Sequence, residues 1–196
     1  LDGVPDDKAQ ANFTDPESRI MRTSGGFEQA YNAQAAVDDE SQVIVAQSVS
    51  NKQNDGGELV AIVDQVEGNV GQRPEQLSAD AGYCSEENLA ALAERDIDSY
   101  VATGRQKHGA SSPTSDEQKN RTPRATQMRE KLRAGGWESP YRLRKQTVEP
   151  VFGQIKEARG FRRFLRRGLA NVQGEWSLLC IAHNLLKLAA ATAVGA

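Results

Sequence analysis

Between residues 30 and 103 the sequence alternates strand-like and helix-like segments, and this alternation limits the folds open to the chain. Residues 30–37 and 42–49, rich in Val, Ile and Ala and separated by a polar turn, predict a β-hairpin. The next segments predict, in order, a helix over 58–67, a strand over 76–79, a helix over 85–95 and a strand over 98–102. This order is typical of a mixed α/β domain.

The rest of the chain divides into three further segments. Residues 1–29 predict a lead-in loop before the α/β core at 30–103. Residues 104–136 are polar and rich in helix breakers, which indicates a flexible or helical insertion rather than core. Residues 137–196 predict a helical region, with a stretch over 141–159 that is interrupted at Pro150. Its last helix, over 176–188, should pack through an apolar face made of Leu178, Leu179, Ile181, Ala182, Leu185 and Leu186.

The composition is that of one globular domain without a membrane or zinc-binding part. The 196 residues are 38% hydrophobic and 26% charged, a balance that allows a sizeable core. No apolar run approaches the roughly 20 residues of a membrane span, and the start of the sequence is not that of a signal peptide. Cys84 and Cys180 are far apart and fit no metal-ligand spacing, which suggests reduced thiols in a cytosol.

Charge is distributed unevenly along the sequence. Residues 1–104 contain 20 Asp/Glu and 6 Lys/Arg, a balance of −14, whereas residues 105–167 contain 6 Asp/Glu and 17 Lys/Arg, a balance of +11. A basic half of this kind points to a polyanionic partner. The alternative is that the two halves neutralise each other within the fold.

Asp80 lies where an α/β sheet builds its ligand sites. The run Ser78-Ala79-Asp80-Ala81-Gly82-Tyr83 places it at the end of a predicted strand, just before a glycine turn and a helix. Open α/β sheets bind ligands in the crevice beyond their strand ends, and the small neighbouring alanines leave room for an ion or a phosphate. The alternative is a turn or capping role, which Asp often has at such junctions.

Glu149 is a single acid in the most basic part of the chain, within Glu149-Pro150-Val151-Phe152-Gly153-Gln154-Ile155-Lys156. An unbroken helix would align Tyr141, Lys145 and Glu149 on one face. Because Pro150 suits a first helical position, we instead expect Glu149 to cap a new helix. One acid among many cations suits metal-dependent chemistry on a nucleic-acid backbone. The alternative is a surface helix whose Glu relieves repulsion between like charges.

An arginine cluster follows, and it is the best candidate for a phosphate-binding surface. It consists of Arg159, Arg162, Arg163, Arg166 and Arg167, with Phe161 and Phe164 between them. Guanidinium groups suit phosphates, while the phenylalanines either stack on bases or anchor the segment.

Other polar residues have simpler interpretations. Asp15 precedes a proline and predicts a turn. Asp55 precedes the helix over 58–67 and predicts its cap. Asp38 and Asp39 fall in the hairpin turn, and His183 is expected to lie in the core or at an interface.

Several motifs, in the right order, resemble the C-terminal part of bacterial insertion-sequence transposases of the DDE type. The motifs are Thr14-Asp15-Pro16-Glu17-Ser18-Arg19, Tyr31-Asn32-Ala33-Gln34-Ala35-Ala36-Val37-Asp38, Ala79-Asp80-Ala81-Gly82-Tyr83, Val148-Glu149-Pro150-Val151-Phe152-Gly153, Gly160-Phe161-Arg162-Arg163-Phe164, Arg167-Gly168-Leu169 and Ala182-His183-Asn184-Leu185-Leu186-Lys187-Leu188. This resemblance covers nearly the whole chain. It implies an RNase H-like fold, a mixed sheet flanked by helices, with a polar insertion and C-terminal helices.

The resemblance also implies the site residues. Asp80 and Glu149 would be catalytic and would ligate metal. The family's Tyr–Arg–Glu–Lys signature falls on Tyr141, Glu149 and Lys156, whereas the Arg is matched in spacing by Lys145 and in residue type by Arg144. The implied DNA-binding residues are Tyr141, Arg144, Lys145, Lys156, Arg159, Arg162, Arg163, Arg166 and Arg167.

The family's cofactors and partners follow in the same way. The resemblance implies Mg²⁺, with Mn²⁺ as a substitute, and DNA at the transposon ends and at the target. It further implies a homodimer in a synaptic complex, no membrane association, and a cytoplasmic, nucleoid-associated location in a bacterium.

The family's first catalytic Asp has no counterpart in this sequence. It lies on a first strand well before the hairpin, whereas the residues that precede Tyr31 predict a loop, and Asp2 has no strand around it. We therefore expect the first strand and its Asp to lie upstream of a chain that begins without Met, and we expect this chain alone not to transpose DNA. The alternatives are a catalytically inactive DNA-binding remnant and another RNase H-like nuclease.

Overall fold

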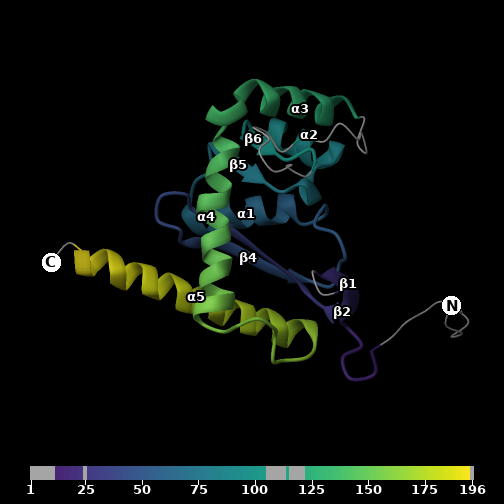
Figure 1. The fold of residues 1–196 in the computed structure, drawn as a ribbon, viewed down its shortest axis with the longest axis vertical. Helices are drawn as coiled ribbons and strands as arrows, with labels where there is room; N and C mark the ends of the chain where they lie inside the picture. The colour runs from purple at the N-terminus through teal and green to yellow at the C-terminus, as the bar shows by residue number, and fades with distance from the viewer. Residues whose placement is uncertain (1–11, 24–25, 105–113, 115–121, 195–196) are drawn as a thin grey trace, which may run out of the picture.

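A computed structural model describes residues 12–23, 26–104, 114 and 122–194. In this part of the chain, three two-stranded sheets lie among five α-helices (Figure 1). The mixed α/β class expected from the sequence is therefore confirmed. The remaining residues of the predicted lead-in and insertion, including Leu1-Asp2-Gly3, lie outside the described residues.

The lead-in, expected to be a loop, contains a hairpin. Strand β1 (Arg19–Thr23) pairs antiparallel with β2 (Gly26–Ala30). Most residues of both strands are at least partly exposed, so no buried alternation marks them in the sequence. A distant residue fixes the hairpin, because the side-chain amide of Gln53 donates a hydrogen bond to the Ile20 carbonyl at 2.9 Å.

Two acids of the lead-in, Asp15 and Glu17, tie it to the start of the C-terminal helix. Asp15 forms the expected turn, and its carboxylate also accepts a hydrogen bond from the Tyr31 hydroxyl at 2.7 Å. The Glu17 carboxylate accepts one at 2.9 Å from the N–H of Leu169, the first residue of α5 (Leu169–Val194). A carboxylate there satisfies an otherwise unpaired helical N–H and interacts favourably with the helix dipole.

The hairpin predicted over 30–49 is confirmed. Strands β3 (Asn32–Val37) and β4 (Ile44–Ser50) pair antiparallel with one bulge. In the turn, the Asp38 carboxylate accepts a hydrogen bond from the Ser41 N–H at 2.8 Å, and Gln42 adopts a left-handed conformation with φ of 58°. Ile44, Ala46 and Val49 of β4 are buried, and Ile44 and Val49 belong to a hydrophobic core.

The next four predicted elements are also present. They are α1 (Leu59–Val70), β5 (Gln76–Ala79), α2 (Glu86–Glu94) and β6 (Asp98–Val101), with a 3₁₀ turn η1 (Ala81–Tyr83) between β5 and α2. Strands β5 and β6 are parallel, so their carboxyl ends lie at the same edge. Helix α2 begins as its sequence predicts, because the Ser85 hydroxyl caps it by accepting a hydrogen bond from the Asn88 N–H at 3.1 Å.

Part of the predicted insertion is core, which corrects the sequence-based expectation. Helix α3 (Pro123–Gly135) buries Ala125, Met128 and Leu132 against the elements around β6. These residues are three and four apart and share one helix face. The expectation failed because three apolar side chains among many charged ones leave only a narrow apolar stripe, which the polar character of the whole segment conceals.

Pro150 lies inside a helix rather than at the start of one. After two 3₁₀ turns, η2 (Gly136–Glu138) and η3 (Pro140–Arg142), helix α4 (Leu143–Gly153) continues as a π-helix, η4 (Gln154–Ala158). Proline has no N–H, so the carbonyl four residues earlier loses its helical donor. That carbonyl, of Gln146, instead accepts a hydrogen bond from the Gln42 side chain at 2.9 Å. The prediction that Glu149 caps a new helix is therefore wrong.

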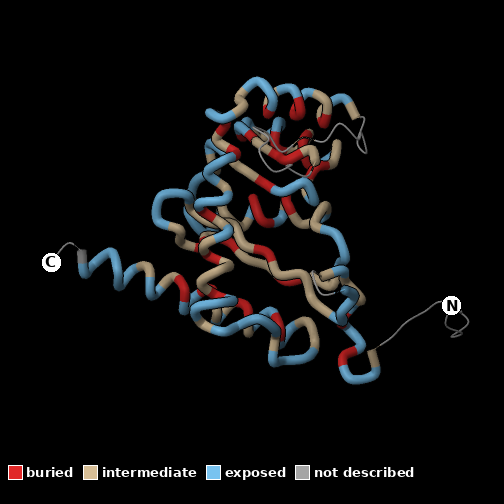
Figure 2. The backbone as a smooth tube through the Cα atoms, viewed as in Figure 1, coloured by how far each residue is buried: buried red, intermediate tan, exposed pale blue. Residues whose placement is uncertain are grey.

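The core is divided into two clusters, one on each side of the strands (Figure 2). The upper core comprises Leu59, Val63, Ala79, Cys84, Leu89, Leu92, Ile97, Val101, Ala102, Ala125, Met128, Leu132 and Tyr141. The lower core comprises Ile44, Val49, Val151, Ile155, Val172, Trp176 and Cys180. The segment from η3 to η4 runs along both cores and connects them.

Between the cores, two strands line one cavity, and each of them pairs with another described strand along one edge only. Within the described ranges, β3 pairs with β4 alone and β5 with β6 alone. Every residue of β3 and of β5 lines a cavity of about 670 Å³, whose other walls include residues of α1 and α4. The described strands therefore do not form the single mixed sheet that the resemblance implies.

Helix α5 packs through a different face from the one predicted. Its buried residues are Val172, Trp176, Cys180 and His183. Of the predicted face, Leu179 packs against the lower core, whereas the other residues are exposed, namely Leu178, Ile181, Ala182, Leu185 and Leu186. Contrary to the expectation from the sequence, residues 169–193 reach the length and hydropathy of a membrane span, with 17% of that window buried. The buried face rests on protein, because the Asn184 amide donates to and accepts from the backbone of Ile44, both at 2.8 Å.

Candidate active site

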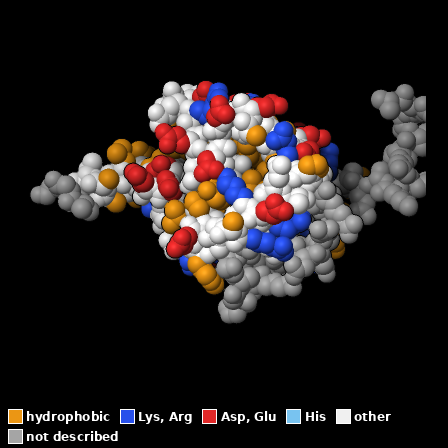
Figure 3. All heavy atoms as spheres, turned by 90° about the horizontal axis from the view of Figure 1, so that it is seen from above, with side chains coloured by type: hydrophobic (Ala, Val, Ile, Leu, Met, Phe, Trp, Pro, Cys, Tyr) orange, Lys and Arg blue, Asp and Glu red, His pale blue; other side chains and the backbone are white. Residues whose placement is uncertain are grey.

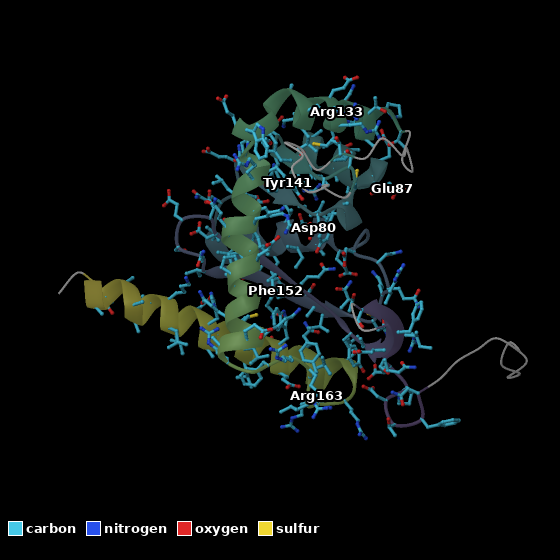
Figure 4. The ribbon with its side chains drawn as sticks, viewed as in Figure 1. Asp80, Glu87, Arg133, Tyr141, Phe152 and Arg163 are labelled. Atoms are coloured by element: carbon cyan, nitrogen blue, oxygen red, sulfur yellow. The ribbon has the colours of Figure 1, made fainter. Side chains whose placement is uncertain are left out.

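Asp80 lies at the end of β5, as predicted, and its half-exposed carboxylate borders the cavity between β3 and β5 (Figure 4). Its backbone is extended, with φ of −70° and ψ of 166°, and leads directly into η1. The turn is closed by a hydrogen bond from the Tyr83 N–H to the Asp80 carbonyl at 3.1 Å. The side chain itself caps no helix, so the capping alternative is not observed.

Arg144, rather than Lys145, faces Asp80. The Arg144 guanidinium forms an ion pair with the Asp80 carboxylate, and its Nε donates a hydrogen bond to the Tyr141 hydroxyl at 3.3 Å. Tyr141 is buried in the upper core and fixes the position of this pair. Lys145, one residue further along the helix, is exposed. Of the two candidates for the Arg of the predicted signature, Arg144, which matches in residue type, pairs with Asp80, whereas Lys145, which matches in spacing, is exposed.

Glu149 lies in the middle of α4, on the same helix as Arg144, and is exposed. Its charge nevertheless acts on the site, because it raises the pKa of Asp80 together with burial and Asp55. Tyr141 responds in the same way: burial raises its pKa, and the charge of Glu149 adds to that rise. The two predicted catalytic acids are therefore within electrostatic reach of each other.

Lys156 lies on the π-helix that extends α4, one of the helix irregularities that are frequent at functional sites. Its ammonium group is 5.6 Å from the centre of the Phe152 ring. Phe152 in turn stacks on Trp176, with ring centres 5.8 Å apart. Lys156 is thus held at the surface by the lower core.

The predicted arginine cluster is divided in role. The Arg159 guanidinium donates to Nδ1 of the buried His183 at 3.2 Å, and Arg162 pairs with Glu157. The other arginines, Arg163, Arg166 and Arg167, are exposed on the segment before α5. Arg163 lies far from Asp80 along the longest axis of the molecule, at the end opposite Tyr141 (Figure 4). The cluster is therefore a surface separate from the Asp80 site.

Some of the basic half is neutralised within the fold, as the alternative interpretation proposed. Arg124 and Lys131 of α3 form ion pairs with Glu86, at 3.4 Å, and with Asp98. Acidic and basic side chains are accordingly interspersed on the face seen from above (Figure 3). The exposed arginines before α5, Arg163, Arg166 and Arg167, are candidates for binding a polyanion.

Asp55 belongs to the site, although the sequence predicted a helix cap. Glu58, rather than Asp55, occupies the N-cap position of α1, and its side chain makes no capping hydrogen bond. The Asp55 carboxylate borders the same cavity as Asp80 and accepts hydrogen bonds from Asn32, at 2.5 Å, and from Gln34, at 3.3 Å. The loop of Asp55 leads from a strand into a helix, so the rule that selected Asp80 would have found it too.

The donor set of this site suits a hard cation. Burial raises the pKa of Asp80, Arg144 opposes that shift, and the charges of Asp55 and Glu149 add to it. Asp80, Asp55 and Glu149 thus carry three negative charges, which the positive charge of Arg144 offsets only in part. A bound Mg²⁺ or Mn²⁺ with oxygen ligands would offset the remaining negative charge. Among the described residues, no three or more His, Cys, Asp or Glu side chains are grouped closely enough to hold a metal by themselves.

Comparison with known proteins identifies the family. A family model described as "Transposase DDE domain" matches residues 8–185, which is nearly the whole chain. Searches of curated proteins and of solved structures found no match. The family match agrees with the resemblance drawn from the motifs around Asp80 and Glu149. The chain therefore belongs to the family of transposases with a DDE domain.

Proposed function

We propose that the chain forms part of a DDE transposase that cleaves DNA phosphodiesters and transfers the freed 3′ ends to target DNA. One observation carries the proposal: Asp80 at the end of β5 pairs with Arg144 of α4, beside Tyr141 and within electrostatic reach of Glu149. A strand-end acid and a helix acid thus lie within electrostatic reach of each other beside Arg144, whose guanidinium group suits a phosphate.

Asp80 and Glu149 would hold Mg²⁺, with Mn²⁺ as a substitute. When bound, two such ions activate the attacking oxygen and stabilise the leaving oxygen during in-line displacement at phosphorus. Arg144 neutralises Asp80 in the structure. We infer that it turns to a DNA phosphate when a cation takes its place, because its guanidinium group suits carboxylate and phosphate equally.

The exposed cations would bind the DNA backbone, with Lys145 and Lys156 holding phosphates beside the scissile bond. Lys145, Lys156, Arg163, Arg166 and Arg167 are exposed on α4, η4 and the segment before α5. Binding through such residues should weaken steeply as salt rises and depend little on sequence. Arg159 and Arg162 stay in the predicted DNA-binding set, although both are engaged within the chain.

We further propose that a strand enters the cavity between β3 and β5 and completes an RNase H-like mixed sheet. Both β3 and β5 line this cavity of about 670 Å³, and an added strand would supply hydrogen-bond partners for the edges of both. A strand parallel to β5 would end beside Asp80, where the first catalytic Asp is expected.

A strand-transfer assay tests the catalytic proposal. A duplex with a free 3′-hydroxyl is incubated with plasmid and Mn²⁺, and joined products are counted for the chain and for a longer form that supplies the additional strand. We expect joining by the longer form alone, abolished by Asp80→Asn and by Glu149→Gln and unchanged by Asp64→Asn, an exposed acid on α1. Joining that survives Asp80→Asn would show that the catalytic assignment is wrong.

The same proteins, assayed also for cleavage of an uncleaved end-containing duplex and for DNA binding, separate the rival functions. Cleavage without joining would favour another RNase H-like nuclease. Salt-sensitive DNA binding without any cleavage in either form would favour a DNA-binding remnant. A homodimer in a synaptic complex and a cytoplasmic, nucleoid-associated location are further proposals, testable by light scattering with end-containing DNA and by cell fractionation.

A further inference from the structure

A second acidic position lies beside Asp80 and has no part in the predicted triad. Asp55 stands in the loop from β4 to α1, and Asp80 in the loop from β5 to α2, and both border the cavity between β3 and β5. The two loops approach closely. A Cβ added at Gly82 would lie only 2.6 Å from the Asp55 carboxylate.

The Asp55 carboxylate is held in a fixed orientation. One of its oxygens, Oδ1, accepts both the Asn32 and the Gln34 side-chain amides, at 2.5 and 3.3 Å. The other, Oδ2, faces Gly82. Within the ranges that the structure describes, no Lys or Arg forms an ion pair with Asp55. A carboxylate that is bound by neutral donors has no counter-charge of its own and can still attract a cation.

Gln34 supplies an independent sign that a ligand belongs here. It is 4% exposed, it borders the cavity, and its Oε1 has no hydrogen-bond partner. A buried acceptor without a donor costs about 1–3 kcal/mol, so an unfilled position of this kind needs an explanation. Its amide nitrogen is bound to Asp55, so the unpartnered oxygen belongs to the same group of side chains.

We propose that Asp55, Gln34 and Asp80 form a binding position for a divalent cation, Mg²⁺ or Mn²⁺. The set consists of two carboxylates and one amide oxygen, which are the ligands that hard cations take. Mg²⁺ in particular is commonly held by one or two carboxylates and completes its shell with waters and substrate phosphates. The inference rests on the proposed function only in that Asp80 is a metal-binding carboxylate; it does not involve Glu149.

Gly82 provides a way to disturb the position without removing a ligand. Its φ is not left-handed, so the backbone there accepts any residue, and only the contact with Asp55 forbids a side chain. Gly82→Ala should displace the Asp55 carboxylate, although it substitutes none of the acidic residues.

The test is Mn²⁺ binding to the full chain, followed by electron paramagnetic resonance, with circular dichroism to verify folding. We expect Asp55→Asn and Asp80→Asn to lose at least about tenfold in affinity for the ion of this position, and Gly82→Ala to lose roughly tenfold. Asp64→Asn is the matched acid control.

The outcomes separate this proposal from the proposed function. Asp55→Asn and Gly82→Ala proteins that fold and bind Mn²⁺ like wild type would overturn the proposal, and so would a wild type that binds no Mn²⁺. If binding is lost in Glu149→Gln and kept in Asp55→Asn, the transposase assignment stands and this position is refuted. If Asp55→Asn loses binding while strand transfer is absent from every form, the position stands and the proposed function fails.

Discussion

The upper and lower cores are built from segments that differ greatly in sequence separation. All residues of the upper core lie between Leu59 and Tyr141, whereas the lower core joins the β4 hairpin to helices beyond residue 150. The upper core therefore forms by short connections such as β5–α2–β6. The lower core closes only when distant segments meet, and its docking is directed by polar contacts such as that of Asn184 with the Ile44 backbone. Burial of apolar area stabilises both cores, but polar groups select the packing face in the lower one.

Substitution of Trp176 is the most direct test of whether the two cores differ in stability. It is 3% exposed, stacks on Phe152, and donates its indole N–H to the Gln34 carbonyl at 3.0 Å. We expect Trp176→Ala to lower the free energy of unfolding by about 3–5 kcal/mol, measured by urea denaturation. Amide hydrogen exchange should accelerate in β4 and α5 more than in β6. Equal acceleration in β6 would mean that the two cores unfold as one unit.

Leu132 tests the corresponding point in the upper core. It is fully buried on α3, within the segment that the sequence assigned to an insertion. Leu132→Ala should cost roughly 2–5 kcal/mol because it leaves a cavity, and exchange should then accelerate in β6 and α2 first. Glu130→Ala, on the exposed side of the same helix, is the control and should stay within about 0.5 kcal/mol of wild type. A loss in Leu132→Ala no larger than that would place α3 outside the core.

Gln42 tests the polar docking of the lower core. Its amide donates to the Gln146 carbonyl that Pro150 leaves free, and its Oε1 accepts a hydrogen bond from Lys187 at 2.6 Å. Gln42→Ala should cost about 1–2 kcal/mol in the free energy of unfolding. Gln42 has a left-handed backbone, which glycine adopts more readily than alanine does. Gln42→Gly therefore shows how much of the change comes from the backbone and how much from the lost side chain. In a Pro150→Ala background, where a helical N–H can bind Gln146, the cost should shrink; an unchanged cost would refute the role given to Pro150.

The sequence predicted the elements whose signals are local. The β3–β4 hairpin has alternating apolar residues around a polar turn, and α2 has a Ser85 cap with acids in its first turn, so both were placed correctly. Hairpin β1–β2 and the packing face of α5 depend on distant partners, such as Gln53 and Ile44, and local patterns do not contain that information. The position of Glu149 was misjudged because a side chain 104 residues away from Gln146 compensates the helix for Pro150.

The candidate site was predictable in part, for the same reason. Asp80 was found because the strand-end rule needs only a strand, a turn and a helix. Arg144 was left undecided against Lys145, since the choice depends on which side of α4 faces β5. Asp55 was missed because its place before a helix was interpreted as a cap, although the strand-end rule applies to it as well; its contacts with Asn32 and Gln34 come from another strand.

Arg144 and its neighbour Lys145 form a matched pair for sharpening the description of the site. Arg144 binds Asp80 and Tyr141, but the Asp80 carboxylate is half-exposed, so the pair stabilises the fold only modestly. Arg144→Ala should cost about 1 kcal/mol, and Lys145→Ala less than about 0.5 kcal/mol. Because Arg144→Ala removes the cation that competes for Asp80, it should also tighten Mn²⁺ binding. Weaker Mn²⁺ binding in this variant would show that Arg144 supports the metal position rather than competing with it.

His183 gives the smallest effect, a dependence of stability on pH within the lower core. Its Nδ1 accepts a hydrogen bond from Arg159, and its Nε2 donates one to the Gln42 carbonyl at 2.9 Å. The bond from Arg159 therefore requires the neutral ring, because a protonated Nδ1 cannot accept it, whereas the bond to the Gln42 carbonyl is kept in either protonation state. Burial lowers the pKa of His183, the charges of Arg159 and Lys187 lower it further, and the Gln42 carbonyl opposes them.

The sign of the effect follows from linkage. The unfolded chain takes up a proton on His183 near pH 6.5, whereas the folded chain does so only at a lower pH. Stability from this residue is thus fully present above about pH 6.5 and is lost as pH falls toward the folded pKa. Urea denaturation between about pH 5.5 and 7.5 should show wild type losing stability on acidification more steeply than His183→Gln. Parallel curves would mean that the ring accepts a proton without disturbing the contact between α5 and the hairpin, and the lower core would then depend on packing alone.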